Sequence, residues 1–207
     1  MRPARLFDLL SPCVCAVCRV PGEPLCAQCR ARLRPLEGPL CACCGAACPV
    51  AVPRCSDCPD GLDWGRQALV YDDTAAALIG ALKDRHRRDL APLLARVMAR
   101  TLPIPSPGSV LVPVPAGPAR VRRRGFDQAQ LIGLALARHW RRPLRGALRR
   151  LDDSHAQRGS GRRERVSGIA GEFVPMPSVP RNVVLIDDVQ TTGATLAECA
   201  RVLRRAG

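Results

Sequence analysis

Two adjacent carboxylates followed by a threonine-rich turn form the most informative pattern in the chain. Asp187 and Asp188 follow the apolar run of residues 183–186, which predicts a strand buried on both faces. Residues 191–195 then read Thr-Thr-Gly-Ala-Thr and lead into a helix expected at 194–206. A turn of small residues at a helix N-terminus binds phosphate through backbone N–H groups and the helix dipole. Because two acids beside such a turn suit the vicinal hydroxyls of a sugar, we predict a phosphorylated ribose as the ligand.

An ordinary strand–turn–helix unit is the alternative interpretation of this stretch. It explains the apolar run and Gly193, but it does not explain two like charges side by side, whose repulsion is costly without a cation or a polyol. We therefore interpret the stretch as a binding site, with the two acids as the catalytic pair if the protein is an enzyme. The predicted contacts are Asp187, Asp188, Val189, Gln190, Thr191, Thr192, Gly193, Ala194 and Thr195.

The N-terminal part of the chain contains a cluster of cysteines, whose thiols could bind metal. Eleven of the 12 cysteines lie between Cys13 and Cys58, and eight of them form four Cys-x-x-Cys pairs. Two such pairs complete a four-thiolate zinc site, whereas a redox dithiol would explain one pair but not four. We predict one or two structural Zn²⁺ ions, with the pairing and the roles of the surplus cysteines left open. The predicted ligands are Cys15, Cys18, Cys26, Cys29, Cys41, Cys44, Cys55 and Cys58.

The alternating strands and helices that follow the cysteines in the sequence must position the two acids. The residue patterns predict strands at 67–71, 109–112, 148–152, 171–174 and 183–186, and helices at 74–83, 88–102, 127–140 and 194–206. Such alternation predicts an α/β fold with a parallel, doubly wound sheet and a ligand crevice at the C-terminal ends of its strands. We place a Cys-rich zinc-binding domain at residues 1–64 and the α/β domain at residues 65–207.

Two loops of the body carry further candidate contacts. Residues 112–120 are rich in proline and could turn backbone N–H groups toward a pyrophosphate, although a plain connector explains them as well. Residues 122–124 are three arginines before a glycine, which suits a loop that closes over a polyanion; a solvated charge run is equally consistent. The candidates for the pyrophosphate end are Pro115, Arg124 and Lys83, the only lysine in the chain.

The net charge of +14 is concentrated in the second part, where residues 67–207 carry 24 basic and 12 acidic groups. This charge attracts polyanions, but aromatic residues make up only 3% of the chain and offer little stacking for bases. Asp8 and Pro12 interrupt the N-terminal apolar stretch, and no apolar run of about 18 residues exists. We therefore expect a cytoplasmic protein without membrane insertion, in which the clustered thiols stay reduced.

The stretch of residues 183–195 resembles the phosphoribosyl-pyrophosphate (PRPP) motif of type I phosphoribosyltransferases, and the whole chain resembles the ComF family, also called ComFC or GntX-like proteins. The shared elements are the Cys-x-x-Cys series, Ala81-Leu-Lys83, Val112-Pro-Val-Pro115, Arg123-Arg-Gly-Phe-Asp-Gln128, and Gln157, Arg165 and Phe173. Asp127 and Gly168 stand where the family has asparagine. The sequence ends at Gly207, where relatives continue into a last strand.

The resemblance implies a type I phosphoribosyltransferase-like parallel sheet flanked by helices, with its C-terminal edge strand missing, behind a zinc-binding head. It implies PRPP as ligand, Mg²⁺ bound together with PRPP, and a role in DNA uptake, with single-stranded DNA and a competence helicase as expected partners. Two interpretations stay open. PRPP is either a regulatory ligand of a DNA-uptake factor or the donor of ribose 5-phosphate to an unidentified acceptor, for which the sequence shows no pocket signature.

Overall fold

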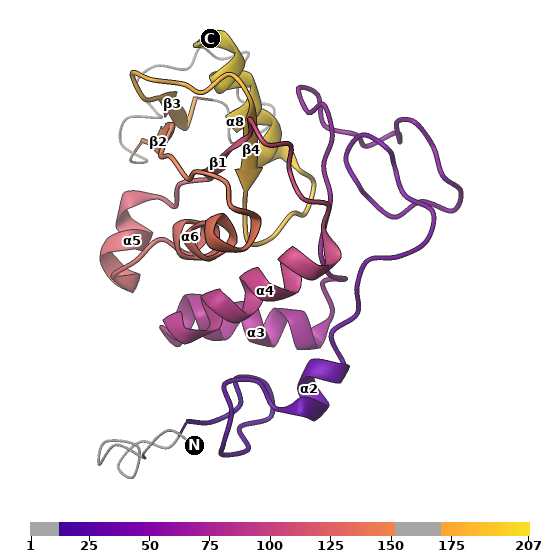
Figure 1. Cartoon of the computed structure of the whole chain (residues 1–207), viewed down its shortest axis with the longest axis vertical. Coiled ribbons are helices and arrows are strands. Elements are labelled where there is room, and N and C mark those ends of the chain that lie inside the picture. The colour runs from indigo at the N-terminus through magenta and orange to yellow at the C-terminus, as the bar shows by residue number, and fades with distance from the viewer. Residues whose placement is uncertain (1–12, 152–170) are drawn as a thin grey trace.

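The computed structural model describes residues 13–151 and 171–207, and over these ranges it is a mixed α/β protein (Figure 1). The helices are α2 (Ala27–Ala31), α3 (Asp73–Asp84), α4 (Ala91–Thr101), α5 (Pro118–Arg124), α6 (Gln128–Trp140) and α8 (Ala194–Arg205), with a 3-10 turn η1 (Arg88–Leu90). The strands are β1 (Val110–Pro113), β2 (Leu148–Arg150), β3 (Phe173–Pro175) and β4 (Val183–Ile186).

β1 and β4 run parallel and form the sheet that carries the candidate site. Their register aligns Val110 with Val183, and Val114 N–H extends the ladder to the C=O of Ile186 at 2.9 Å. Successive side chains of β1 face opposite sides, so Leu111 packs with α4 and α6 in one core and Val112 packs with α8 in another. Figure 1 shows these helices on the two sides of the strands. The predicted parallel sheet flanked by helices is confirmed.

β2 and β3 form a second sheet that is antiparallel, with Leu148 opposite Pro175 and Arg150 opposite Phe173. The sequence predicted both strands within one parallel sheet, and that detail is wrong for the described residues because β2 and β3 run in opposite directions and pair with each other. The predicted end of the first strand at residue 152 lies outside the described residues. So do Gln157, Arg165 and Gly168 of the family resemblance.

Side-chain caps explain where two of the main helices begin. At the start of α3 the Asp72 carboxylate accepts the N–H of Ala75 at 3.0 Å, and at the start of α6 the Asp127 carboxylate accepts the N–H of Gln130 at 3.2 Å. The helix predicted at 88–102 is divided into η1 and α4. Its division places Pro92 in the first turn of α4, where proline is tolerated because no backbone N–H is needed.

Two parts of the body differ from the sequence prediction. Residues 67–71 form no strand; within the described chain Leu69 makes only an isolated bridge with Pro35. The three arginines 122–124 form the last turn of α5 and not an open loop. This helix ends at Gly125, which takes the left-handed conformation with φ 73°, and basic residues in a last turn favour the helix dipole.

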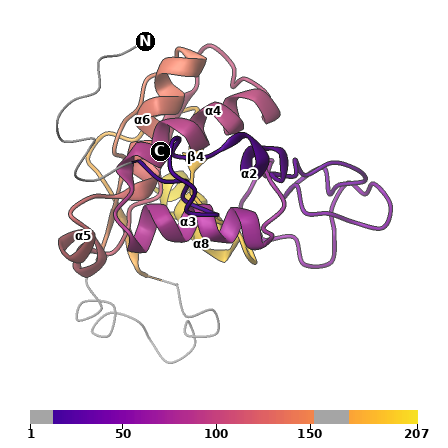
Figure 2. The same ribbon diagram turned by 90° about the horizontal axis from the view of Figure 1, so that it is seen from below.

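The cysteine-rich segment consists of loops and the short helix α2. Cys15 shares a buried core with Leu78 of α3, and Arg85 at the end of α3 donates to the C=O of Ala16 at 2.6 Å. Much of the loops between α2 and residue 58 stands away from the helices in the two perpendicular views of Figures 1 and 2. One part of this segment therefore packs into the body, and another part projects from it.

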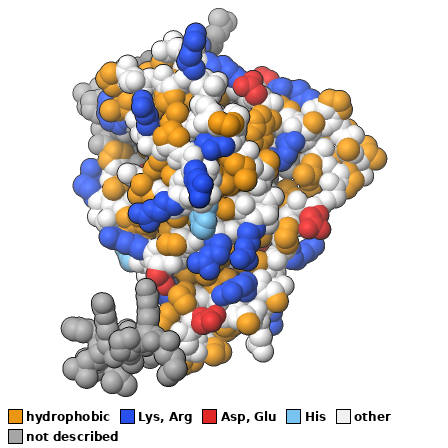
Figure 3. Space-filling model, viewed as in Figure 1, with side chains coloured by type: hydrophobic (Ala, Val, Ile, Leu, Met, Phe, Trp, Pro, Cys, Tyr) orange, Lys and Arg blue, Asp and Glu red, His pale blue; other side chains and the backbone are white. Residues whose placement is uncertain are grey.

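The surface carries basic side chains over most of one face, interspersed with hydrophobic ones and with few acids (Figure 3). This distribution agrees with the excess of 24 basic over 12 acidic groups in residues 67–207. In the two described ranges, every helix is too short or too polar to cross a lipid bilayer.

Candidate anion-binding site and metal centres

Asp187 and Asp188 follow β4 directly and lie at the C-terminal end of the parallel sheet. Asp188 points toward Lys83 in the last turn of α3, and the Lys83 Nζ lies 2.5 Å from its Oδ2. The Asp188 side chain is 4% exposed and that of Lys83 is 24% exposed. Lys83 therefore supplies the counter-charge of the acid pair. Its predicted contact with a pyrophosphate stays a prediction and requires the amine to leave Asp188 or to bridge both groups.

The Asp187 carboxyl group is strongly perturbed by its surroundings. Burial and, to a smaller extent, the negative charge of Asp188 raise the pKa of Asp187, the N–H of Asp188 and the charge of Lys83 lower it, and the net result is a pKa of about 7. That N–H donates to Asp187 Oδ1 at 2.8 Å. Two partly buried acids with one lysine form a site whose charge is incompletely balanced, so a cation or a hydroxyl-bearing ligand would stabilise it.

Residues 190–195, which we call the threonine loop, connect the two acids to α8. Gly193 has φ 75°, a left-handed conformation that a residue with a side chain rarely adopts, and it is the N-cap residue of α8. Thr191 and Thr192 are exposed, and Thr192 Oγ1 accepts the N–H of Ala194 at the long distance of 3.4 Å. Because Gly193 has no side chain to accept the first N–H groups of α8, these donors are available to an anion.

The loop after β1 lies beside the acid pair because β1 and β4 end together. Pro115 follows Val114, whose N–H bonds to Ile186 just before Asp187. Asp127 holds this loop in place: its Oδ2 accepts the N–H of Ala116 at 2.7 Å, while its Oδ1 caps α6. The carboxylate that replaces the family's asparagine therefore has a structural role, since both of its oxygens accept backbone N–H groups.

Arg124 is packed inside the structure and does not extend from a free loop. Its side chain is 9% exposed, its Nη1 donates to Gln128 Oε1 at 3.1 Å, and its Nη2 lies 3.6 Å from Asp84 Oδ1. Its Nε is buried and has no acceptor among the described residues. His86 Nδ1 lies 3.1 Å from the C=O of Arg124, which fixes the end of α5 to the end of α3. A contact between Arg124 and a ligand stays a prediction.

A cavity of about 420 Å³ includes Asp187 and Asp188 in its lining. The other walls come from residues 61–71, from α3 and α4, and from the apolar side chains of β4. Trp64 and Tyr71 line it as well and are largely exposed, at 46% and 58%. The sequence did not identify these aromatic residues as part of a site, because only tertiary folding brings them into the lining of the same cavity as the acids.

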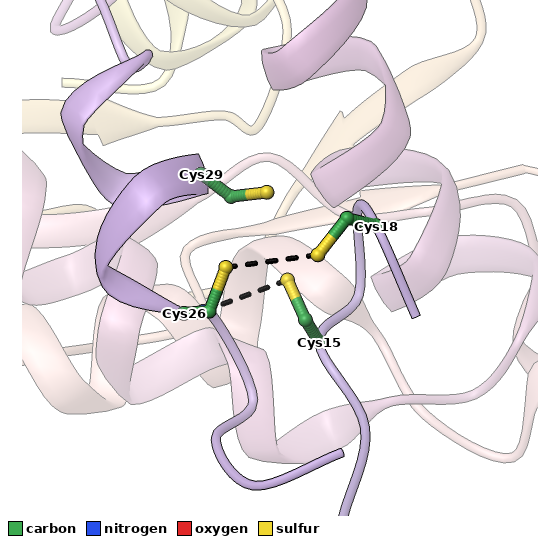
Figure 4. Close-up of side chains that lie close together, drawn as sticks. All are labelled: Cys15, Cys18, Cys26 and Cys29. Carbon is green, nitrogen blue, oxygen red and sulfur yellow. Dashed lines mark hydrogen bonds between the residues drawn. The ribbon is translucent and has the colours of Figure 1, made fainter. Parts of the chain in front are cut away.

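The eight predicted cysteine ligands form two groups, and in each group the four Sγ atoms lie within 4.8 Å of one another. The first cysteine group contains Cys15, Cys18, Cys26 and Cys29, and the second contains Cys41, Cys44, Cys55 and Cys58. Figure 4 shows the four side chains of the first group directed toward a common centre. Tetrahedral Zn–S bonds of about 2.3 Å place sulfur atoms about 3.8 Å apart. Sulfur pairs at 3.6 Å in the first group and at 3.6 and 3.9 Å in the second fit that spacing.

The ionisation of the thiols differs within each group. Burial opposes ionisation of Cys15, but N–H groups led by that of Cys26 outweigh it and lower the pKa of Cys15 to about 6. Hydrogen bonds led by the N–H of Cys44 lower the pKa of Cys41 to about 6. Burial raises the pKa of Cys29 to about 12. Each group thus has one readily formed thiolate and at least one thiol, Cys29 in the first group and Cys55 in the second, whose pKa burial raises and which a nearby cation would help to ionise. Both groups could hold zinc ions.

Three further cysteines lie beside the two groups. Cys43 Sγ donates to the C=O of Leu62 at 3.4 Å, and Cys48 Sγ donates to the C=O of Ala46 at 3.5 Å. Cys13 is exposed, and its Sγ lies 3.8 Å from Arg87 Nη2. These three thiols are not members of the two sets of four that converge, although the Cys43 side chain also interacts with that of Cys58.

The fold and sites define an α/β protein with two four-cysteine groups that could each hold a metal ion and an acid pair beside a threonine loop. Over 212 residues it is 30% identical to Competence protein F of Haemophilus influenzae, covering 93% of this chain and 91% of that protein. It is 29% identical over 199 residues to Competence protein ComFC of Bacillus subtilis, covering 90% and 80%. It is 30% identical over 218 residues to DNA utilization protein YhgH of Escherichia coli K12, covering 96% and 94%. The chain belongs to the ComF family.

No family model matches the chain. No solved structure matches it either.

Proposed function

We propose that this protein binds PRPP at the end of β4 and assists DNA uptake during natural transformation in the cytoplasm. The observation that carries the proposal is the arrangement of Asp187 and Asp188 beside the open N-terminus of α8. A phosphate monoester would accept N–H groups of the threonine loop. The ribose hydroxyls would donate to the two carboxylates.

The charge of the acid pair supports a polyol ligand at this position. Asp188 is paired with Lys83, while Asp187 has a pKa raised to about 7 by burial and by Asp188. Hydroxyl groups that donate to Asp187 would stabilise its ionised form, so ligand binding and ionisation support each other. Mg²⁺ would enter with the pyrophosphate of PRPP, since carboxylate, phosphate and hydroxyl oxygens are the ligands that it prefers.

The DNA-uptake part of the proposal comes from the family. The relatives are named competence proteins and DNA utilization proteins. The basic face in Figure 3 would support contact with the phosphates of single-stranded DNA. A competence helicase is the proposed protein partner. Structural zinc in both cysteine groups is proposed to hold the segment that precedes the α/β body.

A second function, transfer of ribose 5-phosphate to an acceptor, is favoured by one specific observation. The cavity of about 420 Å³ next to Asp187 and Asp188 has the size of a small-molecule pocket, with Trp64 and Tyr71 in its lining. In this enzyme the two acids would stabilise the cationic ribosyl group as pyrophosphate leaves. Pyrophosphate release from PRPP and Mg²⁺, assayed with each nucleobase, separates turnover from binding.

The decisive experiment is calorimetric titration of PRPP with Mg²⁺ into the wild type and into the Asp187→Asn, Asp188→Asn double variant. Because two hydrogen bonds to charged groups contribute about 1.5–3 kcal/mol each, the double variant should bind more than about 100-fold more weakly. Asp73→Asn, an exposed acid on α3, is the matched control and should bind as the wild type does. Equal affinity of the double variant and the wild type would reject the site.

Single-stranded DNA binding is measured separately by fluorescence anisotropy over a range of salt concentrations, with and without PRPP. A phosphate-driven complex weakens steeply as salt increases. An effect of PRPP on the DNA affinity would link the two ligands. Salt-independent binding would contradict a basic-surface interaction.

A further inference from the structure

The segment of residues 59–63, which follows the last ligand of the second cysteine group, lies against the threonine loop. Pro59 is adjacent in sequence to Cys58, and its ring occupies the space next to Gly193. A Cβ added to Gly193 would come within 2.8 Å of Pro59 Cγ. Gly193 therefore lacks a side chain for two reasons, its left-handed φ and the presence of this ring.

Helix α8 holds the same segment further along. Arg204 in the last turn donates through Nη1 to the C=O of Gly61 and pairs through Nη2 with Asp63 Oδ1 at 2.6 Å. Gly61 packs against the helix, because a Cβ added there would lie 3.6 Å from the C=O of Ala197. The 59–63 segment thus spans α8 from the threonine loop to the last turn.

The second cysteine group and its neighbour Cys43 hold both ends of this segment. The segment begins directly after Cys58, and shortly after its end the N–H of Gly65 donates to the C=O of Cys43 at 2.5 Å. Gly65 also packs against Cys44, since a Cβ added to Gly65 would lie 3.0 Å from the C=O of Cys44. The surplus thiol of Cys43 donates to the C=O of Leu62 within the segment.

We propose that the 59–63 segment is a wall of the sugar-phosphate site and that metal binding by the second cysteine group controls this site through it. The inference rests on the proposed role of the threonine loop as a phosphate site. Without the metal, no bond joins the four thiols, and the loops between them are no longer closed. The free chain then has more conformations, and ordering it over Gly193 costs more free energy. The controlled ligand is a sugar phosphate such as PRPP.

The test removes the contact between Arg204 of α8 and the 59–63 segment and leaves every cysteine unchanged. Arg204→Ala removes the contacts of α8 with Gly61 and Asp63, and Arg205→Ala removes the same charge from the neighbouring exposed position. Both variants should retain two zinc ions per chain. Hydrogen exchange of amides 190–195 is measured without ligand, and the Kd for PRPP with Mg²⁺ is measured by calorimetry. We expect faster exchange and about 2- to 30-fold weaker binding for Arg204→Ala alone.

A Cys55→Ser, Cys58→Ser double variant tests the metal itself. It should hold one zinc instead of two, exchange faster at residues 190–195, and bind PRPP more weakly than Arg204→Ala does. If this variant is unfolded by circular dichroism, Arg204→Ala and Arg205→Ala decide the question. Wild-type exchange at 190–195 in Arg204→Ala overturns the inference. Failure of the wild type to bind PRPP overturns the proposed function instead, and the exchange data still report on the contact.

Discussion

Lys83 Nζ lies 2.5 Å from Asp188 Oδ2, and this ion pair joins the end of α3 to the end of β4. The lysine was predicted as a contact for the pyrophosphate end of the ligand, and the aspartate was predicted as a contact for the ribose hydroxyls. In the structure the two side chains form an ion pair with each other. This ion pair determines the charge of the site in the absence of a ligand.

Lys83→Met should destabilise the protein by about 3 kcal/mol, because it leaves the buried Asp188 carboxylate without its counter-charge. Urea unfolding at neutral pH gives the free energy. Adding Asp188→Asn to Lys83→Met removes the stranded charge and should restore most of the loss. Additive effects of the two substitutions would show that the ion pair contributes no coupling.

Asp187→Asn should change how stability depends on pH. Because the pKa of Asp187 is raised from 3.8 to about 7, the folded state retains a proton that the unfolded chain releases at lower pH. The stability from this proton is fully present below pH 3.8 and is lost as the pH rises through about 7. The free energy of unfolding of the variant minus that of the wild type should therefore increase from about pH 4 to 7 and then level off. A difference that is constant with pH would contradict the raised pKa.

Asp127→Ala should destabilise the protein by about 1–2 kcal/mol, because it removes the cap of α6 and the bond to Ala116 together. Asp127→Asn keeps one acceptor oxygen and should lose less. Thermal unfolding of both variants checks the order of their stabilities. If the asparagine variant were the less stable one, the two N–H contacts of the carboxylate would not be what holds the loop after β1.

Removal of metal should lower the melting temperature of the whole protein, because Cys15 packs in the same core as Leu78 of α3. Cys26→Ser should lose one of two zinc ions, measured by elemental analysis, and should melt at a lower temperature. Cys48→Ser, whose thiol lies outside both groups, is the matched control and should keep both ions. Equal zinc content in the two variants would contradict the assignment of the first group. Limited proteolysis after chelation would test the predicted domain boundary at residues 64–65.

Much of the framework follows from local patterns in the sequence. The apolar run before Asp187 forms β4, as predicted. The turn of small residues after the two acids leads into α8, which begins at Ala194, also as predicted. Asp127 starts α6 because a carboxylate at this position satisfies a free N–H group. The eight cysteines converge in two groups because each Cys-x-x-Cys turn already brings two sulfur atoms together.

Other features depend on contacts between distant residues and left no local signal. Nothing near Lys83 predicts that its amine pairs with Asp188. The contact of Pro59 with Gly193 likewise joins residues far apart in the chain. The strand predicted at 67–71 is not formed because an apolar stretch becomes a strand only where a neighbouring strand is free to pair with it, and this stretch lines the cavity instead.

The chain has one lysine, and the structure places its amine on the acid pair. Lysine labelled with ¹⁵N at Nζ would therefore give a single side-chain ammonium resonance, free of assignment ambiguity. Its frequency and its rate of proton exchange with water would report directly on the occupancy of the neighbouring carboxylate. A protein so rich in arginine thus contains its own magnetic-resonance probe at the position where ligand binding is proposed to occur.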